Sequence, residues 1–115
     1  MDALVQTNQD EWNIVQGEAT AYAPLDNQSG MCAQGEGDKT SWGLTPGPNV
    51  FAVDPKRIPY GSTMLVVVGD QVYSGIAGDT GGDIRASEKY MVDIFHETYA
   101  EAKQFGRKDA LILWK

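Results

Sequence analysis

The clearest structural signal in the sequence is the stretch TMLVVVGDQVYSGIA, residues 63–77. It contains two runs of β-favouring residues, Thr63–Val68 and Gln71–Ala77, with only Gly69 and Asp70 between them. A two-residue connection with glycine first is typical of the primed turns that join antiparallel strands. The first run does not alternate between apolar and polar residues, which is expected for a strand covered on both sides or one that crosses the inside of a small barrel. We therefore predict a β-hairpin at this position.

Further short β-favouring segments lie on both sides of the hairpin, at residues 13–23, 50–53, 90–95 and 109–115. Glycine and small polar residues are frequent at residues 24–48 and 78–87, and these two segments are predicted to be loops.

One short helix is expected at residues 97–105, because Phe95, Tyr99 and Ala102 follow helical spacing and Gly106 is placed as a left-handed cap. Five or six strands and one helix in so short a chain predict an all-β fold. We expect a small closed barrel whose single helix precedes the last strand.

Composition limits the possible partners and cofactors. The chain has 115 residues, which fits one domain at residues 13–115 behind a polar lead-in at residues 1–12. A net charge of −7 is the wrong sign for a partner held through phosphates, so neither nucleic acid nor an anionic membrane is an expected partner. The longest apolar run, Met64–Val68, is far shorter than the roughly 20 residues of a spanning helix, and no signal peptide is expected within these residues. With one cysteine, Cys32, and one histidine, no intramolecular disulfide and no metal are expected.

Three aspartates lie within or at the end of apolar runs and are candidates for chemistry. Asp93 stands inside MVDIF, where a carboxylate must face a polar cleft, be buried with partners, or lie on the solvent side of an alternating strand. Asp54 ends FAVD before Pro55, and Asp79 ends GIAGD before Thr80. Both of the latter also fit the ordinary role of aspartate in turns.

Asp79-Thr80-Gly81 spells the active-site triplet of aspartic proteases, and Gly106-Arg107 extends the likeness to the retroviral enzymes. Those enzymes place the triplet early and need a long flap-bearing stretch before the Gly-Arg element. Only 27 residues separate Asp79 from Gly106, so the spacing argues against a protease.

A different resemblance accounts for more of the sequence and covers about residues 19–115. Its motifs are, in order, ATAY at 19–22, FAVDP at 51–55, IPYG at 58–61, AGDTGGDIR at 77–85 and VDIF at 92–95. They resemble the three-aspartate (3D) domain found in small stationary-phase and resuscitation-type lytic transglycosylases and in the catalytic domain of membrane-bound lytic transglycosylase A. The resemblance implies a six-stranded double-psi β-barrel that cleaves the glycan strands of peptidoglycan. An insertion near residues 86–90 and Arg85-Ala86 in place of Lys-Gly depart from the family pattern and bear on glycan specificity.

The same resemblance implies that Asp93 is the single acid/base of a lytic transglycosylase, which cleaves the MurNAc–GlcNAc β-1,4 bond and leaves 1,6-anhydromuramyl ends. This chemistry needs a carboxylic acid that is protonated near neutral pH, and neighbouring carboxylates together with an apolar strand raise a pKa. Asp79 and Asp54 would tune and orient Asp93, and Gly81 and Gly82 would let the backbone approach the sugar closely. The remaining candidates for glycan contacts are Tyr22, Lys39, Thr40, Trp42, Thr80 and Arg85. The resemblance requires no metal or other cofactor.

Two other functions remain open on the same barrel. One is an inverting glycoside hydrolase that uses two carboxylates, and the other is a non-catalytic, expansin-like module that binds cell-wall glycans. The expected site of action is the bacterial cell wall, reached from the extracellular or periplasmic side or by a phage.

Overall fold

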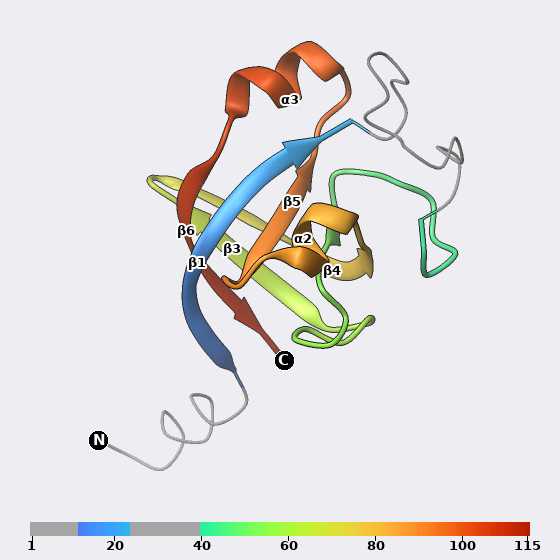
Figure 1. Cartoon of the computed structure of the whole chain (residues 1–115), viewed down its shortest axis with the longest axis vertical. Coiled ribbons are helices and arrows are strands. Elements are labelled where there is room, and N and C mark those ends of the chain that lie inside the picture. Colours follow the sequence, from blue (N-terminus) through green and yellow to red (C-terminus); the bar gives the residue numbers. More distant parts are fainter. Residues whose placement is uncertain (1–11, 24–39) are drawn as a thin grey trace.

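The computed structural model describes residues 12–23 and 40–115, drawn as a cartoon in Figure 1. The strands of the described residues are β1 (Asn13–Tyr22), β2 (Val50–Ala52), β3 (Thr63–Val68), β4 (Gln71–Asp79), β5 (Met91–Phe95) and β6 (Lys108–Trp114). Their helices are α2 (Gly82–Ala86) and α3 (Tyr99–Phe105). Among these residues, neither helix is long or apolar enough to cross a membrane.

The six strands close into a barrel in the order β1-β5-β2-β4-β3-β6, with β6 pairing back onto β1. The pairs β1–β5 and β2–β4 are parallel, and the other four pairs are antiparallel. Among these six described strands, β3 and β4 are the only paired strands that are consecutive in the sequence. The register pairs Val68 with Gln71 and leaves Gly69 and Asp70 as the turn, as predicted. The small six-stranded double-psi barrel expected from the sequence is confirmed.

The barrel interior is filled by alternate residues of the strands. Met64, Val66 and Val68 of β3 are buried, whereas Leu65 and Val67 between them are partly exposed on the outside. Thus β3 alternates in burial although Met64–Val68 is continuously apolar. Of the two arrangements predicted for this strand, cover on both sides is wrong, because Leu65 and Val67 are partly exposed. The largest fully buried side chains of the main core include Phe51, Ile58, Met64, Ile94 and Ile112.

The predicted loop at residues 78–87 is wrong in two respects. Strand β4 continues to Asp79, and residues 82–86 form the short helix α2. The buried side chain of Ile84 explains why this segment folds as a helix, because it packs with Ala52 and Met91 in a second apolar cluster. The described part of the chain therefore contains one more helix than the sequence predicts.

The predicted helix before the last strand is confirmed, but it begins at Tyr99 and not at residue 97. The hydroxyl of Thr98 accepts the Glu101 N–H at 3.1 Å and so caps the helix. Gly106 ends the helix with φ of 71° and ψ of −141°, a conformation that favours glycine but is not the predicted left-handed cap.

Candidate active site

The strand register places two of the predicted aspartates, Asp93 and Asp79, in one row that crosses four neighbouring strands. Thr20 of β1 pairs with Asp93 of β5, Asp93 pairs with Ala52 of β2, and Ala52 pairs with Asp79 of β4. Residues paired in this way project from the same face of a sheet. Ala52 packs beneath Ile84 of α2, so the row lies on the outer face of the barrel beside α2. Because one strand lies between them, the Cα atoms of Asp93 and Asp79 are separated by two strand spacings, about 10 Å.

A bulge at the end of β4 brings Asp79 to this face. Phe51 pairs with Ala77, but the next residue, Ala52, pairs with Asp79, so Gly78 is the extra residue. Ala77 is fully buried in the main core. In a regular strand Asp79 would project to the same side as Ala77, and the bulge instead turns its carboxylate outward.

The carboxylate of Asp79 is held by three donors from separate parts of the chain. Its Oδ2 atom accepts the Tyr22 hydroxyl at 3.3 Å. Its Oδ1 atom accepts the backbone N–H groups of Ser41 at 3.0 Å and Thr80 at 2.9 Å. Asp79 therefore connects the loop that carries Ser41 to the ends of β1 and β4. These hydrogen bonds fix the orientation of its carboxylate at the end of the row.

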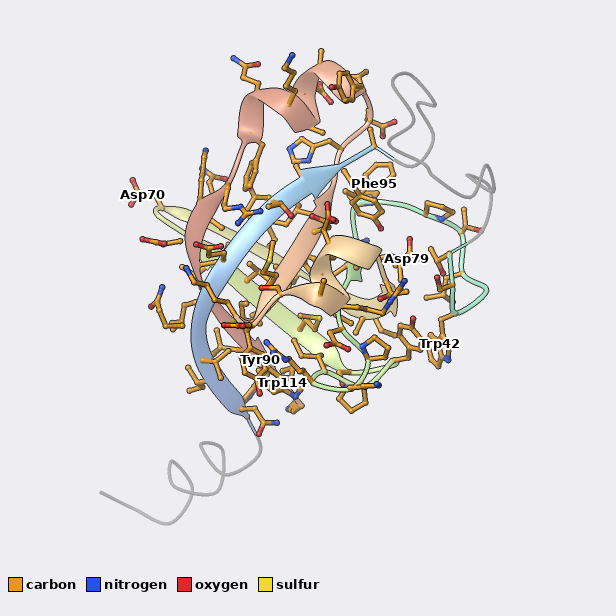
Figure 2. All side chains as sticks on the ribbon, viewed as in Figure 1. Trp42, Asp70, Asp79, Tyr90, Phe95 and Trp114 are labelled. Carbon is orange, nitrogen blue, oxygen red and sulfur yellow. The ribbon has the colours of Figure 1, made fainter. Side chains whose placement is uncertain are left out.

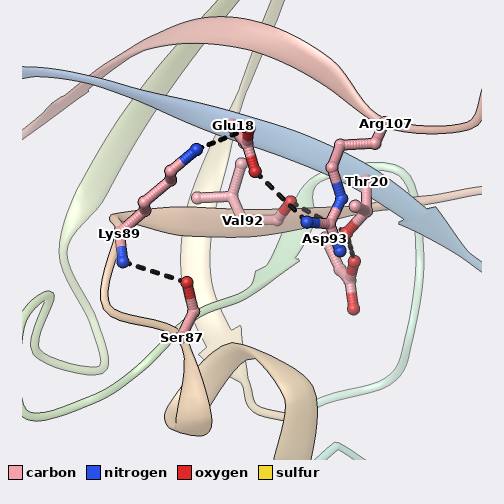
Figure 3. Close-up of polar contacts among 7 residues, drawn as sticks. All are labelled: Glu18, Thr20, Ser87, Lys89, Val92, Asp93 and Arg107. Atoms are coloured by element: carbon pink, nitrogen blue, oxygen red, sulfur yellow. Dashed lines mark hydrogen bonds and ion pairs between the residues drawn. The ribbon is translucent and has the colours of Figure 1, made fainter.

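Asp93 is half-buried in the middle of β5 and contacts Thr20, whose hydroxyl donates to Oδ1 of Asp93 (Figure 3). The same hydroxyl lies 3.4 Å from the carbonyl oxygen of Val92. A hydroxyl can both donate and accept, so Thr20 can donate to an ionised Asp93, or accept from a protonated Asp93 while donating to Val92. Thr20 thus provides a partner for both protonation states of the acid.

The pKa of Asp93 is raised to about 7. Burial has the largest effect, the negative charges of Asp83 and Asp79 act in the same direction, and the positive charge of Arg107 opposes them. An apolar surrounding disfavours the charged carboxylate, and like charges nearby add to the effect. Asp93 is therefore an aspartic acid that still holds a proton at a pH near neutrality.

The third aspartate, Asp54, has local partners in the turn after β2. Its Oδ1 accepts the Lys56 N–H at 3.0 Å, and its Oδ2 lies 3.9 Å from Nε of Arg57. This is the turn-forming role that the sequence also allowed, and a part for Asp54 in orienting Asp93 stays a prediction.

The structure places the other predicted residues around Asp79 and α2. The Thr80 hydroxyl accepts from Nη1 of Arg85 at 3.2 Å. Gly81 is the N-cap of α2 and Gly82 its first residue, and a Cβ at Gly82 would meet no atom within 4 Å. Open space therefore lies beside Gly82.

The loop before β2 carries the remaining candidates. Trp42 is 46% exposed and stacks on Tyr60 with ring centroids 6.1 Å apart, and Figure 2 shows it on the same side of the molecule as Asp79. Thr40 is buried, and its hydroxyl accepts the Leu44 N–H at 3.0 Å, so its side chain stabilises the turn. Lys39 lies outside the described residues. Glycan contacts by Thr40, Lys39 and Trp42 stay predictions.

Sequence reasoning missed three residues that act on Asp93: Thr20, Asp83 and Arg107. Asp83 lies within the DTGGD run, in a segment predicted to be a loop, and helix α2 brings it near Asp93. Arg107 comes from the connection between α3 and β6, and no local pattern relates it to Asp93. Within residues 12–23 and 40–115, no three His, Cys, Asp or Glu side chains lie together in a way that could hold a metal ion.

The fold and this row define a small double-psi barrel that carries, on its outer face, an aspartate whose pKa is raised to about 7. Residues 49–114 match the 3D domain model, and the chain belongs to the 3D domain family. It is 33% identical over 103 residues to the SPbeta prophage-derived uncharacterized protein YorM of Bacillus subtilis (strain 168), a match that covers 84% of this chain and 40% of YorM.

Several solved structures are similar in fold, and two of the proteins illustrate the likeness. One is MltA of Escherichia coli, with a TM-score of 0.52 and 22% identity over 66% of this chain and 26% of MltA. The other is the apo expansin of Clavibacter michiganensis, with a TM-score of 0.59 and 14% identity over 90% of this chain and 50% of the expansin. The chain thus spans half or less of each of these relatives.

Proposed function

We propose that this protein is a lytic transglycosylase that cleaves the β-1,4 bond between MurNAc and GlcNAc in peptidoglycan and leaves 1,6-anhydromuramyl ends. The observation that carries the proposal is Asp93, a half-buried acid whose pKa is raised to about 7. An acid with this pKa can both give and take a proton at neutral pH, which a reaction with one acid/base requires.

The reaction needs one carboxyl group because the sugar supplies its own nucleophile. Asp93 gives its proton to the glycosidic oxygen as the bond from that oxygen to C1 of the muramic acid breaks. The C6 hydroxyl oxygen of the same sugar then bonds to C1, and the carboxylate of Asp93 takes the hydroxyl proton. Asp93 regains its proton, no water is consumed, and the products are a 1,6-anhydro end and a free 4-hydroxyl.

The neighbours of Asp93 fit these two proton transfers. Asp83 and Asp79 keep the acid protonated before the bond breaks. Thr20 can change from acceptor to donor as the proton leaves Asp93. The glycan would lie across the outer face, with open space beside Gly82 and with Trp42 exposed for stacking on a sugar ring.

Family membership and fold support the same assignment. The solved neighbour MltA is a lytic transglycosylase of known structure, and its barrel resembles this one. We infer from this that the protein acts at the bacterial cell wall, on the extracellular or periplasmic side or as part of a phage.

The test is a digestion of purified peptidoglycan followed by mass spectrometry of the released fragments. We expect soluble fragments with 1,6-anhydromuramyl ends, formed in the presence of EDTA as well as in its absence. Asp93→Asn should lower the rate by at least about a hundredfold, because the amide has no proton to give at this pH. Asp70→Asn is the matched control, since Asp70 lies in the exposed hairpin turn, far from Asp79 in Figure 2.

The products also decide between this proposal and its two alternatives. Reducing ends formed with uptake of water would indicate a hydrolase. Binding to peptidoglycan without release would indicate a wall-binding module, an alternative that the fold likeness to an expansin over 90% of the chain favours. Full activity of Asp93→Asn would overturn the assignment of the acid even if anhydro products were found.

A further inference from the structure

Three charged side chains form a cluster beside Asp93, and none of them gives or takes a proton in the proposed reaction (Figure 3). Glu18 of β1 accepts from Nζ of Lys89 at 3.3 Å and from Nη1 of Arg107 at 3.4 Å. Lys89 belongs to the connection between α2 and β5, and Arg107 to the connection between α3 and β6. Two segments distant in the sequence therefore place cations on one carboxylate.

The cluster carries one more positive charge than the carboxylate neutralises. The Glu18 side chain is only 16% exposed, whereas those of Lys89 and Arg107 are 68% and 62% exposed. Ion pairs with such exposed partners contribute little to folding stability. A guanidinium has five N–H donors and an ammonium has three, so each cation keeps donors that can reach a ligand while it remains paired with Glu18.

The position of the cluster relates it to the proposed reaction. Glu18 and Thr20 are two residues apart on β1, so they project from the same face, and Thr20 contacts Asp93. Strand β1 lies on one side of β5, and β2 followed by β4 lies on the other. Asp79 of β4 is therefore on the side of Asp93 opposite to Glu18 and Thr20. The outer face thus carries a net positive charge on the β1 side of the acid. On the β4 side Asp79 and Asp83 outweigh Arg85, which lies beside Thr80, and leave a net negative charge.

We infer that Arg107 and Lys89, held in place by Glu18, form a subsite for a carboxylate carried by the glycan. This inference rests on the proposed function, because it concerns the sugar that lies beside Asp93. N-acetylmuramic acid bears a lactyl carboxyl group, free or extended by a peptide with its own carboxylates, and N-acetylglucosamine bears none. Arginine and lysine bind such groups through charge-assisted hydrogen bonds, and the arginine fork can hold both oxygens.

The subsite would also orient the glycan strand. A carboxylate is attracted to the side of Arg107 and Lys89 and repelled from the side of Asp79. The sugar that carries it is then the one placed over β1 and β5, with its glycosidic oxygen within reach of Asp93. The charge distribution on this face would therefore select which of the two alternating bonds in the strand is cleaved.

The test measures binding in the Asp93→Asn background, where no cleavage changes the ligand. Isothermal titration calorimetry at low salt would compare the tetrasaccharide (GlcNAc–MurNAc)₂ with free lactyl carboxylates and the neutral chitotetraose. We expect the carboxylate-bearing ligand to bind at least about fivefold tighter. In the added double variant Lys89→Gln/Arg107→Gln, the two ligands should bind within about twofold of each other.

Two further variants test whether a lost preference comes from the subsite itself, from the change in net charge, or from misfolding. Lys56→Gln/Lys103→Gln removes the same charge from exposed positions and should keep the preference. If the double variant at Lys89 and Arg107 unfolds because Glu18 is left unpaired, adding Glu18→Gln removes the uncompensated carboxylate, and the preference should again be lost.

Equal binding of the two ligands, no binding of the carboxylate-bearing one, or a preference that survives Lys89→Gln/Arg107→Gln would each overturn the inference. So would loss of the preference in Lys56→Gln/Lys103→Gln. None of these outcomes depends on cleavage, so a failed digestion experiment and a failed binding experiment contradict different claims.

Discussion

Both negatively and positively charged side chains lie near the carboxyl group of Asp93 and change its pKa. Burial has the largest effect, Asp83 and Asp79 act in the same direction, and the guanidinium of Arg107 acts against them. The balance leaves the pKa of Asp93 at about 7, so the group is poised between its two protonation states at neutral pH. An acid that must give and regain a proton in one turnover needs this intermediate value.

This proton affinity also has a consequence for stability. An unfolded aspartate loses its proton near pH 4, whereas folded Asp93 keeps it to about pH 7, so its contribution to folding is present at low pH and is lost as the pH rises through 7. Asp93→Asn cannot ionise and escapes this loss. We therefore expect the stability of Asp93→Asn relative to the natural protein to rise by about 1–3 kcal/mol between pH 4 and pH 8. Urea unfolding at both pH values measures the difference.

The exposed Asp70→Asn variant serves as the control, and its relative stability should stay nearly constant with pH. A relative stability of Asp93→Asn that stays constant or falls over the same range would mean that Asp93 ionises normally in the folded protein.

At the scale of single elements, strand β4 passes so close to Asn49, the residue before β2, that position 75 must be a glycine. A Cβ on Gly75 would lie 2.2 Å from the carbonyl oxygen of Asn49, which also accepts the Ile76 N–H at 2.9 Å. The obstructing atoms belong to the backbone, so a side chain here must displace β2 and with it Ala52 at the centre of the site. Gly75→Ala should lower the free energy of unfolding by about 2–3 kcal/mol.

Gly47→Ala gives a matched control for this prediction. A Cβ at Gly47 would meet no atom within 4 Å, so we expect a change of less than about 0.5 kcal/mol. Chemical denaturation of both variants measures the two values, and equal effects would refute the close approach.

Elements with strong local signals were predictable, and those that depend on distant partners were not. The β3–β4 hairpin follows from its two β-rich runs and its two-residue turn. Helix α2 has five residues and begins with a glycine, so its local propensity is low, and it forms because Ile84 is buried against Ala52 and Met91. The bulge at Gly78, which turns Asp79 outward, depends on the pairing of β4 with β2.

For the whole molecule, barrel closure brings the site together from segments that are far apart in the sequence. The resemblance to 3D domains predicted Asp93, Asp79 and Asp54 as site residues from local motifs. The contact of Thr20 with Asp93 joins residues 73 positions apart, and the pair of Glu18 with Arg107 spans 89 positions. Such partners have no signal in a single sequence, because only the order of strands in the closed barrel makes them neighbours.

The proposed reaction requires that Asp93 still holds its proton near neutral pH, ready to protonate a glycosidic oxygen. NMR titration of the protein with ¹³C-labelled aspartate carboxyl groups measures this, and the signal absent from Asp93→Asn identifies the residue. We expect a midpoint at about pH 7, which Asp83→Asn should lower because one negative neighbour is removed. A midpoint near 4, the ordinary value for aspartate, would contradict it.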